Sequence, residues 1–194
     1  MKKSVHHIPD FTVLFWGRLL ASMSLQTQAV IVGWYVYELT HDPLLLGLIG
    51  LAEALPAIGF AFLSGHVVDS RKPASVYRVC VWMLVVNALI IWLSVWPGLG
   101  ITAGFRLLIL FSAVFVSGMV RSFTSPSVFA LIAHIVPREH LSQAAAWNSS
   151  AFQLAAICGP AIGGIVYGAL GPAVAFSIPP FFNGTRALQL ALVF

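Results

Sequence analysis

The sequence predicts an all-α polytopic membrane protein whose helices cross the bilayer six times. Three observations predict this fold class. Hydrophobic residues make up 59% of the 194 residues and charged residues only 8%, against about 25% charged residues in soluble domains. The apolar runs continue for about twenty residues, which is the length of a helix that spans a bilayer core of ~30 Å. Lysine and arginine gather in the segments expected on one side of the membrane.

Composition excludes several other classes of protein. Sixteen charged side chains are too few to cover a soluble fold, and the apolar content is too high for a disordered chain. The net charge of +4 reflects a scarcity of acids and forms no basic patch, so we expect no nucleic-acid partner. Cys80 and Cys158 both lie in apolar runs, and no metal site or cofactor is predicted. Since no Walker-type loop or nucleophile-and-base set stands out, neither a nucleotide-driven pump nor an enzyme is expected.

The six spans are expected at about residues 11–37, 44–67, 76–96, 107–128, 144–169 and 172–194. Turn signals separate them. They are Thr40-His41-Asp42-Pro43, Asp69-Ser70-Arg71-Lys72-Pro73, Pro97-Gly98-Leu99-Gly100 and Gly171-Pro172. The longest connection, residues 129–143, is expected to hold a short helix along the membrane interface. A barrel strand would instead alternate polar and apolar residues over about ten positions.

The orientation follows from the distribution of lysine and arginine. One side of the membrane carries Lys2, Lys3, Arg71, Lys72, Arg78 and Arg138, whereas the other carries Arg106. We therefore expect the N-terminus, the loops after the second and fourth spans, and the C-terminus to be cytoplasmic.

Charged side chains inside a span are costly, so each one is a candidate functional residue. Glu53 is the single acid that we place deep in the membrane, either as a protonation site for coupling or cargo or as a carboxylic acid bonded to a neighbouring helix. Arg18 either extends to the cytoplasmic surface or heads a polar stripe. The stripe comprises Arg18, Ser22, Gln26, Gly33 and Tyr37, which share one helical sector and should face the bundle interior or a wet cavity.

Two further arginines and one small-residue face complete the candidates. Arg121 pairs with a carboxylate, anchors a cytoplasmic gate, contacts anionic cargo or extends to the surface. Arg186 is expected to extend toward the inner membrane face. In the fifth span, Asn148, Phe152, Ala155, Gly159, Gly163 and Val166 share a face on which another backbone can approach. Pro160 is able to bend this span, although static packing explains the same pattern.

Residues 65–69, Gly-His-Val-Val-Asp, resemble the start of motif A of the major facilitator superfamily, which reads roughly G-x-L-A-D-R-x-G-R-R. Gly65 and Asp69 match this pattern. Ser70 stands where arginine is usual, and positive charge is displaced to Arg71 and Lys72. The resemblance implies that Gly65, Asp69, Arg71 and Lys72 form a gating loop whose cytoplasmic contacts stabilise an outward-open state.

Two more stretches carry the resemblance. Residues 155–164 are similar to motif C, G-x-x-x-G-P-x-x-G-G, with Gly159, Pro160, Gly163 and Gly164 matching. Residues 121–126 and 136–141 are similar to the R-A-F-x-x-P … V-P-R-E-x-L pattern of one branch of the superfamily. That branch is the drug:proton antiporter group, which contains macrolide-efflux and siderophore-export proteins. Three motifs in order on the predicted spans identify the superfamily.

The resemblance implies half of a twelve-helix fold, built as a 3+3 inverted-repeat bundle. The expected protein is the N-terminal half of a proton-coupled exporter of small amphipathic molecules in a bacterial inner membrane. Its expected partners are lipid, a small-molecule substrate, protons and a second six-helix half. Glu53 would take the proton, and Arg18, Ser22, Gln26 and Asn148 would line the cavity. The alternative is a membrane scaffold, regulator or transporter remnant that moves nothing.

Overall fold

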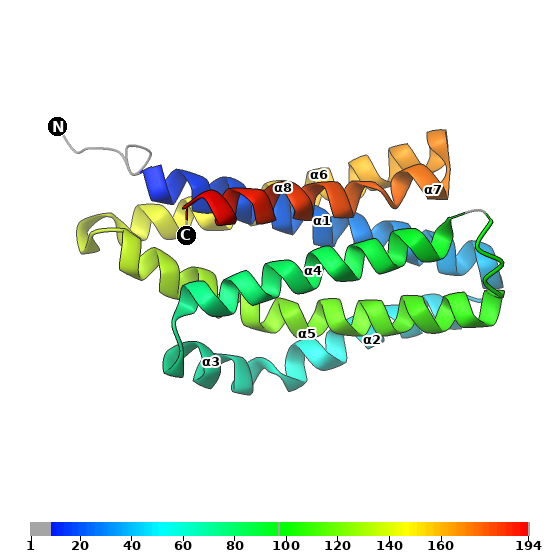
Figure 1. Ribbon diagram of the computed structural model, residues 1–194, viewed down its shortest axis with the longest axis horizontal. Coiled ribbons are helices and arrows are strands. Elements are labelled where there is room, and N and C mark those ends of the chain that lie inside the picture. The colour runs from blue at the N-terminus through cyan, green and yellow to red at the C-terminus, as the bar shows by residue number, and fades with distance from the viewer. Residues whose placement is uncertain (1–8, 97, 194) are drawn as a thin grey trace.

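The computed structural model describes residues 9–96 and 98–193, and it is predominantly helical over that range (Figure 1). The helices are α1 (Pro9–Thr40), α2 (Pro43–Gly59), α3 (Ala61–Ser70), α4 (Pro73–Val95), α5 (Ala103–Ile135), α6 (Leu141–Leu170), α7 (Pro172–Ala175) and α8 (Ile178–Val193), with a 3-10 turn, η2, at Arg138–His140. Within the described residues, α1, α4, α5 and α6 are each long and apolar enough to cross a membrane, and the bent pair α2–α3 makes a fifth candidate span. The predicted all-helical architecture is therefore confirmed for the described residues, and its long apolar helices are consistent with a polytopic membrane protein.

The sixth predicted span, 172–194, is divided in the structure. It consists of the short α7 and the 16-residue α8, and α8 alone is shorter than the ~20 residues of a typical span. The number of crossings thus remains a prediction at this last segment. Gly171, which precedes α7, has a positive φ of 81°, a conformation that glycine adopts without steric cost.

α5 extends beyond the predicted fourth span. The sequence predicts that span to end at about Val128, whereas the helix continues for about two more turns to Ile135. Pro126 removes one backbone hydrogen bond without ending the helix, and Leu131 and Ile132 beyond it are buried in the core. The connection to α6 is correspondingly short, and its only helical part is η2.

The second predicted span, 44–67, is bent by 45° between α2 and α3. Two residues account for the break. Pro56 has no N–H to bond to the preceding turn, and Gly59 is the last residue of α2. Asp42 fixes the start of α2, because its side chain accepts a hydrogen bond from the Leu44 backbone N–H at 2.8 Å.

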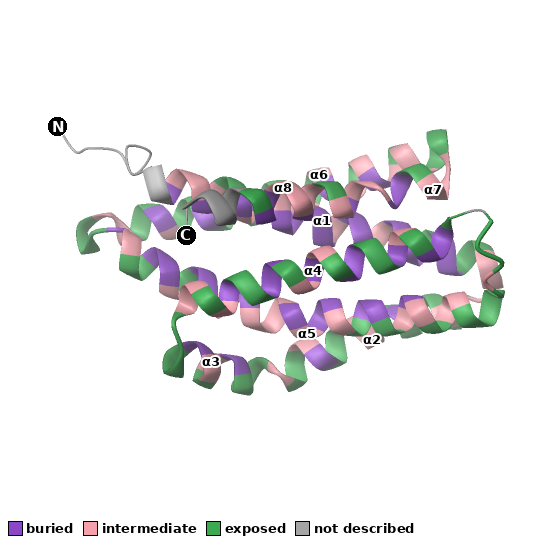
Figure 2. Ribbon diagram, in the orientation of Figure 1, coloured by how far each residue is buried: buried purple, intermediate pink, exposed green. Residues whose placement is uncertain are grey.

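The helices lie side by side along the long axis of the molecule (Figure 1). α1 packs most extensively on α6, α5 packs on both α2 and α4, and α8 packs on α1 and α4. Figure 2 shows buried residues on the facing sides of the helices and exposed residues on the outer sides. Large apolar side chains stand on the outer sides, with Ile157 and Ile165 about 70% exposed. Such a surface suits contact with lipid.

The positively charged turns lie together at one end of the bundle. The start of α1, the α3–α4 turn, the α5–α6 connection and the end of α8 share this end (Figure 1). Arg71, Lys72 and Arg138 belong to these connections. Arg106 lies near the opposite end, where it donates a 2.9 Å hydrogen bond to the Tyr35 hydroxyl. The clustering supports the orientation inferred from the sequence, which itself stays a prediction.

Two helix crossings depend on glycine. A Cβ atom at Gly118 of α5 would lie 2.1 Å from the backbone oxygen of Glu53 in α2. A Cβ atom at Gly159 of α6 would lie 2.8 Å from the Cβ of Gln26 in α1. The Thr27 hydroxyl also donates a 3.0 Å hydrogen bond to the Gly159 carbonyl. Both crossings bring backbones closer than any larger residue permits.

We predict that Gly118→Ala destabilises the bundle by about 3 kcal/mol, because the added methyl group forces α5 away from rigid α2 backbone. Thermal unfolding in detergent micelles measures the change. Gly50→Ala is the matched control on α2, since nothing lies within 4 Å of its Cβ position, and it should leave stability unchanged within about 1 kcal/mol. Equal effects of the two substitutions would contradict the close approach.

Candidate functional site

Arg121 of α5 joins three helices through its guanidinium group. Its Nη1 donates to Glu53 Oε1 of α2 at 2.7 Å, and its Nη2 donates to Gln26 Oε1 of α1 at 3.0 Å. In the described part of the chain, Arg121–Glu53 is the only ion pair. The Glu53 side chain is 20% exposed and the Arg121 side chain 35% exposed. The group is therefore partly exposed on one side, while packed helices hold it on the other.

This Arg121–Glu53–Gln26 cluster lies in the middle of the bundle. About four helical turns of α5 follow Arg121, and Gln26 is near the centre of α1. Arg121 consequently does not extend to the inner surface. Among the interpretations open from the sequence, the structure bears out pairing with a carboxylate. The contact is a charge-assisted hydrogen bond, of the kind that makes a charge tolerable at membrane depth.

The two glycine crossings position the cluster. Gly118 lies one turn before Arg121 on α5 and contacts the backbone of Glu53 itself. Gly159 performs the same role for Gln26. The carboxylate and the amide that face Arg121 are thus carried by the two backbone segments that approach a neighbouring helix most closely. Small residues therefore lie opposite polar ones at these two crossings, a relation that helix periodicity alone does not reveal.

A second group of buried amide contacts lies about one turn before Arg121 on α5. Gln28 of α1 and Asn87 of α4 each donate from their amide nitrogen to Ser117 Oγ at 2.9 Å. Asn87 also donates to the Ala113 carbonyl at 3.0 Å. Sequence reasoning did not select these three residues as site residues. Their signal was nevertheless present, because buried amides in apolar spans require hydrogen-bond partners on other helices.

The predicted polar stripe of α1 faces inward over most of its length. Ser22 and Gly33 are buried, Arg18 and Gln26 are partly buried, and Tyr37 is exposed. Asn148, the cavity residue predicted on α6, is buried as well. The structure brings Gln26 to Glu53 and Arg121, whereas a role for the other residues in lining a cargo cavity remains a prediction.

The residues that resemble transporter motifs are placed as follows. Gly65 and Asp69 lie on α3, and the turn that follows holds Arg71 and Lys72. Asp69, Arg71 and Lys72 are exposed and form no ion pair within the described residues, so their gating role stays a prediction. On α6, Gly159 and Gly163 are buried against α1, while Gly164 has no neighbour at its Cβ position. The helix continues through Pro160.

The sequence predicts that Arg186 extends toward the membrane surface, and the structure contradicts this prediction. Arg186 is fully buried on α8, and its Cζ lies 4.5 Å from the centre of the Tyr77 ring. Asn183 and Ala187, which share its helical face, are buried too. The expectation was wrong because this face of α8 is directed at α1 and α4, not at lipid.

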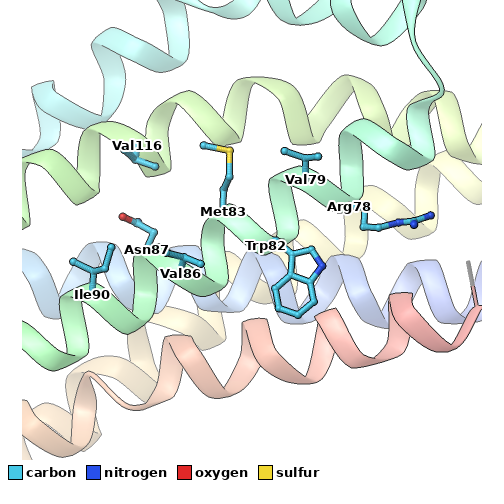
Figure 3. Close-up of a pocket in the computed structure, with 8 residues that line it drawn as sticks. All are labelled: Arg78, Val79, Trp82, Met83, Val86, Asn87, Ile90 and Val116. Carbon is cyan, nitrogen blue, oxygen red and sulfur yellow. The ribbon is translucent and has the colours of Figure 1, made fainter.

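A groove of about 480 Å³ runs along α4 and α5 (Figure 3). It is lined by Arg78, Val79, Trp82, Met83, Val86, Asn87, Ile90 and Val116. Figure 3 shows Arg78 at one end of the row and Ile90 at the other. The predicted cavity residues on α1 and α6 do not border this groove, whose lining is mainly apolar.

Comparisons with known proteins agree with this architecture. A family model described as transmembrane secretion effector matches residues 6–185. An uncharacterized major-facilitator-type transporter of Bacillus subtilis, YkuC, is 23% identical over 163 residues. The aligned region covers 84% of this chain and 36% of the relative, so the chain spans about a third of that protein's length.

The Arg121–Glu53 contact predicts a measurable coupling energy. In a double-mutant cycle of Arg121→Gln and Glu53→Gln, we expect about 1–2 kcal/mol of coupling in the free energy of unfolding. This is less than the ~3–5 kcal/mol lost on breaking fully buried pairs, because Arg121 is partly exposed. Arg106→Gln combined with Glu53→Gln serves as the control and should be additive, since Arg106 bonds Tyr35 at one end of the bundle. A coupling near zero for Arg121 would show that the contact contributes nothing.

Proposed function

The chain belongs to the transmembrane secretion effector family of the major facilitator superfamily, and from that premise we propose that it is the N-terminal half of a proton-coupled exporter. Family membership indicates transmembrane transport and gives no sign of enzymatic chemistry. The cargo we propose is a small amphipathic molecule of the drug or siderophore type, moved outward across a bacterial inner membrane. The family's description as a secretion effector favours the outward direction.

The packing pattern supports a six-helix bundle made of two inverted three-helix repeats. In this arrangement, α1, α2–α3 and α4 form the first repeat, and α5, α6 and α7–α8 form the second. The first helix of each repeat packs against the second helix of the other, as α1 on α6 and α5 on α2. Each of these two crossings has a glycine at its closest point, Gly159 and Gly118. A two-fold axis in the membrane plane between the two repeats would produce this reciprocal packing.

The main support for proton coupling is the hydrogen bond that Arg121 donates to Glu53. Protonation of Glu53 would remove its charge and weaken the 2.7 Å contact with the guanidinium. Arg121 would then keep Gln26 as its neutral partner. Because the three residues come from α2, α5 and α1, the change would alter the relative free energies of two helix arrangements. That is the requirement for a proton to bias a conformational equilibrium.

Two observations support the proposal of a second six-helix bundle. They are the exposed apolar surface of this chain and the greater length of its bacterial relative. The chain spans 36% of its bacterial relative, and its outer sides carry many exposed large hydrophobic residues. We propose that one side contacts lipid and another contacts a second six-helix bundle, with cargo held between the two. The second bundle is either a C-terminal half or another copy of this chain.

We predict that Glu53→Gln abolishes transport driven by a pH gradient. In vesicles that contain the chain with its second half, an imposed proton gradient should drive ethidium efflux by the unmodified protein. Glu53→Gln should reduce this rate more than tenfold, because glutamine cannot take up or release a proton. Ethidium fluorescence in everted vesicles measures the rate, and downhill ethidium exchange without a gradient tests whether the fold and cargo path persist.

Glu38→Gln is the matched control for this experiment. Glu38 is also a helical glutamate, but it accepts a hydrogen bond from Tyr167 away from Arg121. It should retain gradient-driven efflux. Unchanged efflux in Glu53→Gln would remove Glu53 from coupling, and the absence of ethidium flux in the unmodified protein would favour the scaffold alternative.

A further inference from the structure

Arg186 is a buried cation whose donors have no partners among the described residues. The residue is 0% exposed, and its Nε, Nη1 and Nη2 make no hydrogen bond within that part of the chain. Its guanidinium lies over the face of Tyr77 of α4, whose hydroxyl is buried and also lacks a described partner. Leu14, one turn before Arg18 on α1, packs in one buried cluster with Tyr77 and Ala187, and the Arg18 Nε is a further buried donor without a partner in the described part of the chain. Three helices thus direct two cations and a hydroxyl to one region.

The contact with the Tyr77 ring does not compensate for this burial. A cation–π contact recovers only a small part of the hydration free energy that a buried arginine loses, and the donors left unpaired recover none of it. Arg18, on the neighbouring α1, adds a second positive charge to this part of the bundle. Negative charge in this region would offset the cost.

The acids described in the structure are placed elsewhere. Glu53 bonds Arg121, and Glu38 accepts a hydrogen bond from Tyr167. Asp42 caps the start of α2. Asp69 and Glu139 are exposed at connections between helices. Asp10 is the sixth acid of the chain, and its side chain lies outside the described part.

We propose that Arg18, Arg186 and Tyr77 form a binding site for one oxyanion, a carboxylate or phosphate group. Guanidinium groups bind both anions through paired N–H donors in a fixed plane, and a tyrosine hydroxyl adds one more donor. Arg186 supplies the buried floor of the site. Arg18 is only partly buried and supplies the entrance from the surface. This proposal does not depend on transport.

Two sources of the anion are compatible with the position of the site. Tyr77 lies one turn after the start of α4, and Arg186 lies two turns before the end of α8. Both ends belong to the positively charged end of the bundle (Figure 1). A dissolved oxyanion and the phosphate of an anionic lipid headgroup would both be attracted to this end.

Thermal unfolding of the purified full chain in maltoside micelles tests the proposal, because these micelles contain no phosphate. Tryptophan fluorescence reports unfolding while sodium phosphate or sodium acetate replaces sodium chloride at constant ionic strength. We expect the Tm of the unmodified chain to rise with the logarithm of oxyanion concentration once the site begins to fill. Phosphatidylglycerol added to the micelles, with diacylglycerol as the phosphate-free control, tests the lipid source.

Substitutions of Arg186 and Arg18 test whether any rise in Tm comes from oxyanion binding at the proposed site. Arg186→Met should raise the Tm measured without oxyanion, because it removes a buried unpaired charge, and should abolish the response to phosphate, acetate and phosphatidylglycerol. Arg186→Lys and Arg18→Gln should each weaken the apparent affinity at least tenfold, which keeps the test valid should Arg186→Met fail to fold. Arg78→Gln removes an exposed charge from α4 and is the matched control, with an unchanged response.

Three results would overturn the proposal. One is the absence of any response of the unmodified chain to phosphate, acetate or phosphatidylglycerol. Another is a response that survives in Arg186→Met or that Arg78→Gln weakens as strongly as Arg18→Gln. The third is a rise in Tm with oxyanion that Asp10→Asn shows and the unmodified chain does not. In that case the Asp10 carboxylate would occupy the site in the unmodified chain. A chain that binds oxyanions but fails to export ethidium would contradict the proposed function alone.

Discussion

A charge at the centre of a membrane bundle must be paired, and this requirement organises the middle of the molecule. Arg121 is acceptable there because Glu53 and Gln26 both accept its hydrogen bonds. Side chains of this length reach a common point only if their helices are close. Gly118 and Gly159 allow that approach, one beside Glu53 and the other beside Gln26. The electrostatic requirement and the small-residue packing are therefore one constraint.

α5 connects this constraint to the rest of the bundle. Within little more than one turn it presents Ser117 to the amides of α1 and α4, Gly118 to the backbone of α2, and Arg121 to Glu53 and Gln26. A shift of α5 would disturb all of these contacts together. A rearrangement in this region would thus be cooperative, because packed interfaces change between discrete arrangements rather than deforming gradually.

Hydropathy predicted most of the helices because apolar runs of about twenty residues have few alternatives. It identified Glu53 and Arg121 separately, as charges in apolar surroundings. Their pairing depends on the rotation and spacing of α2 and α5, which a linear pattern does not contain. Local rules also misplaced two features. The predicted fourth span stops at about Val128 although tertiary packing continues α5 to Ile135, and Arg186 is predicted at the surface although its face of α8 is buried.

The two internal cationic regions differ in one respect that bears on transport. Arg121 has an acid partner, whereas Arg18 and Arg186 have none among the described residues. At Arg121 the compensating charge comes from α2, so any change in that contact acts on α1, α2 and α5 together. At Arg186 the described part of the chain supplies no acid, so a compensating charge would come from a bound anion. Transport would thus draw on the first region, whereas the second fits an anion that stays in place.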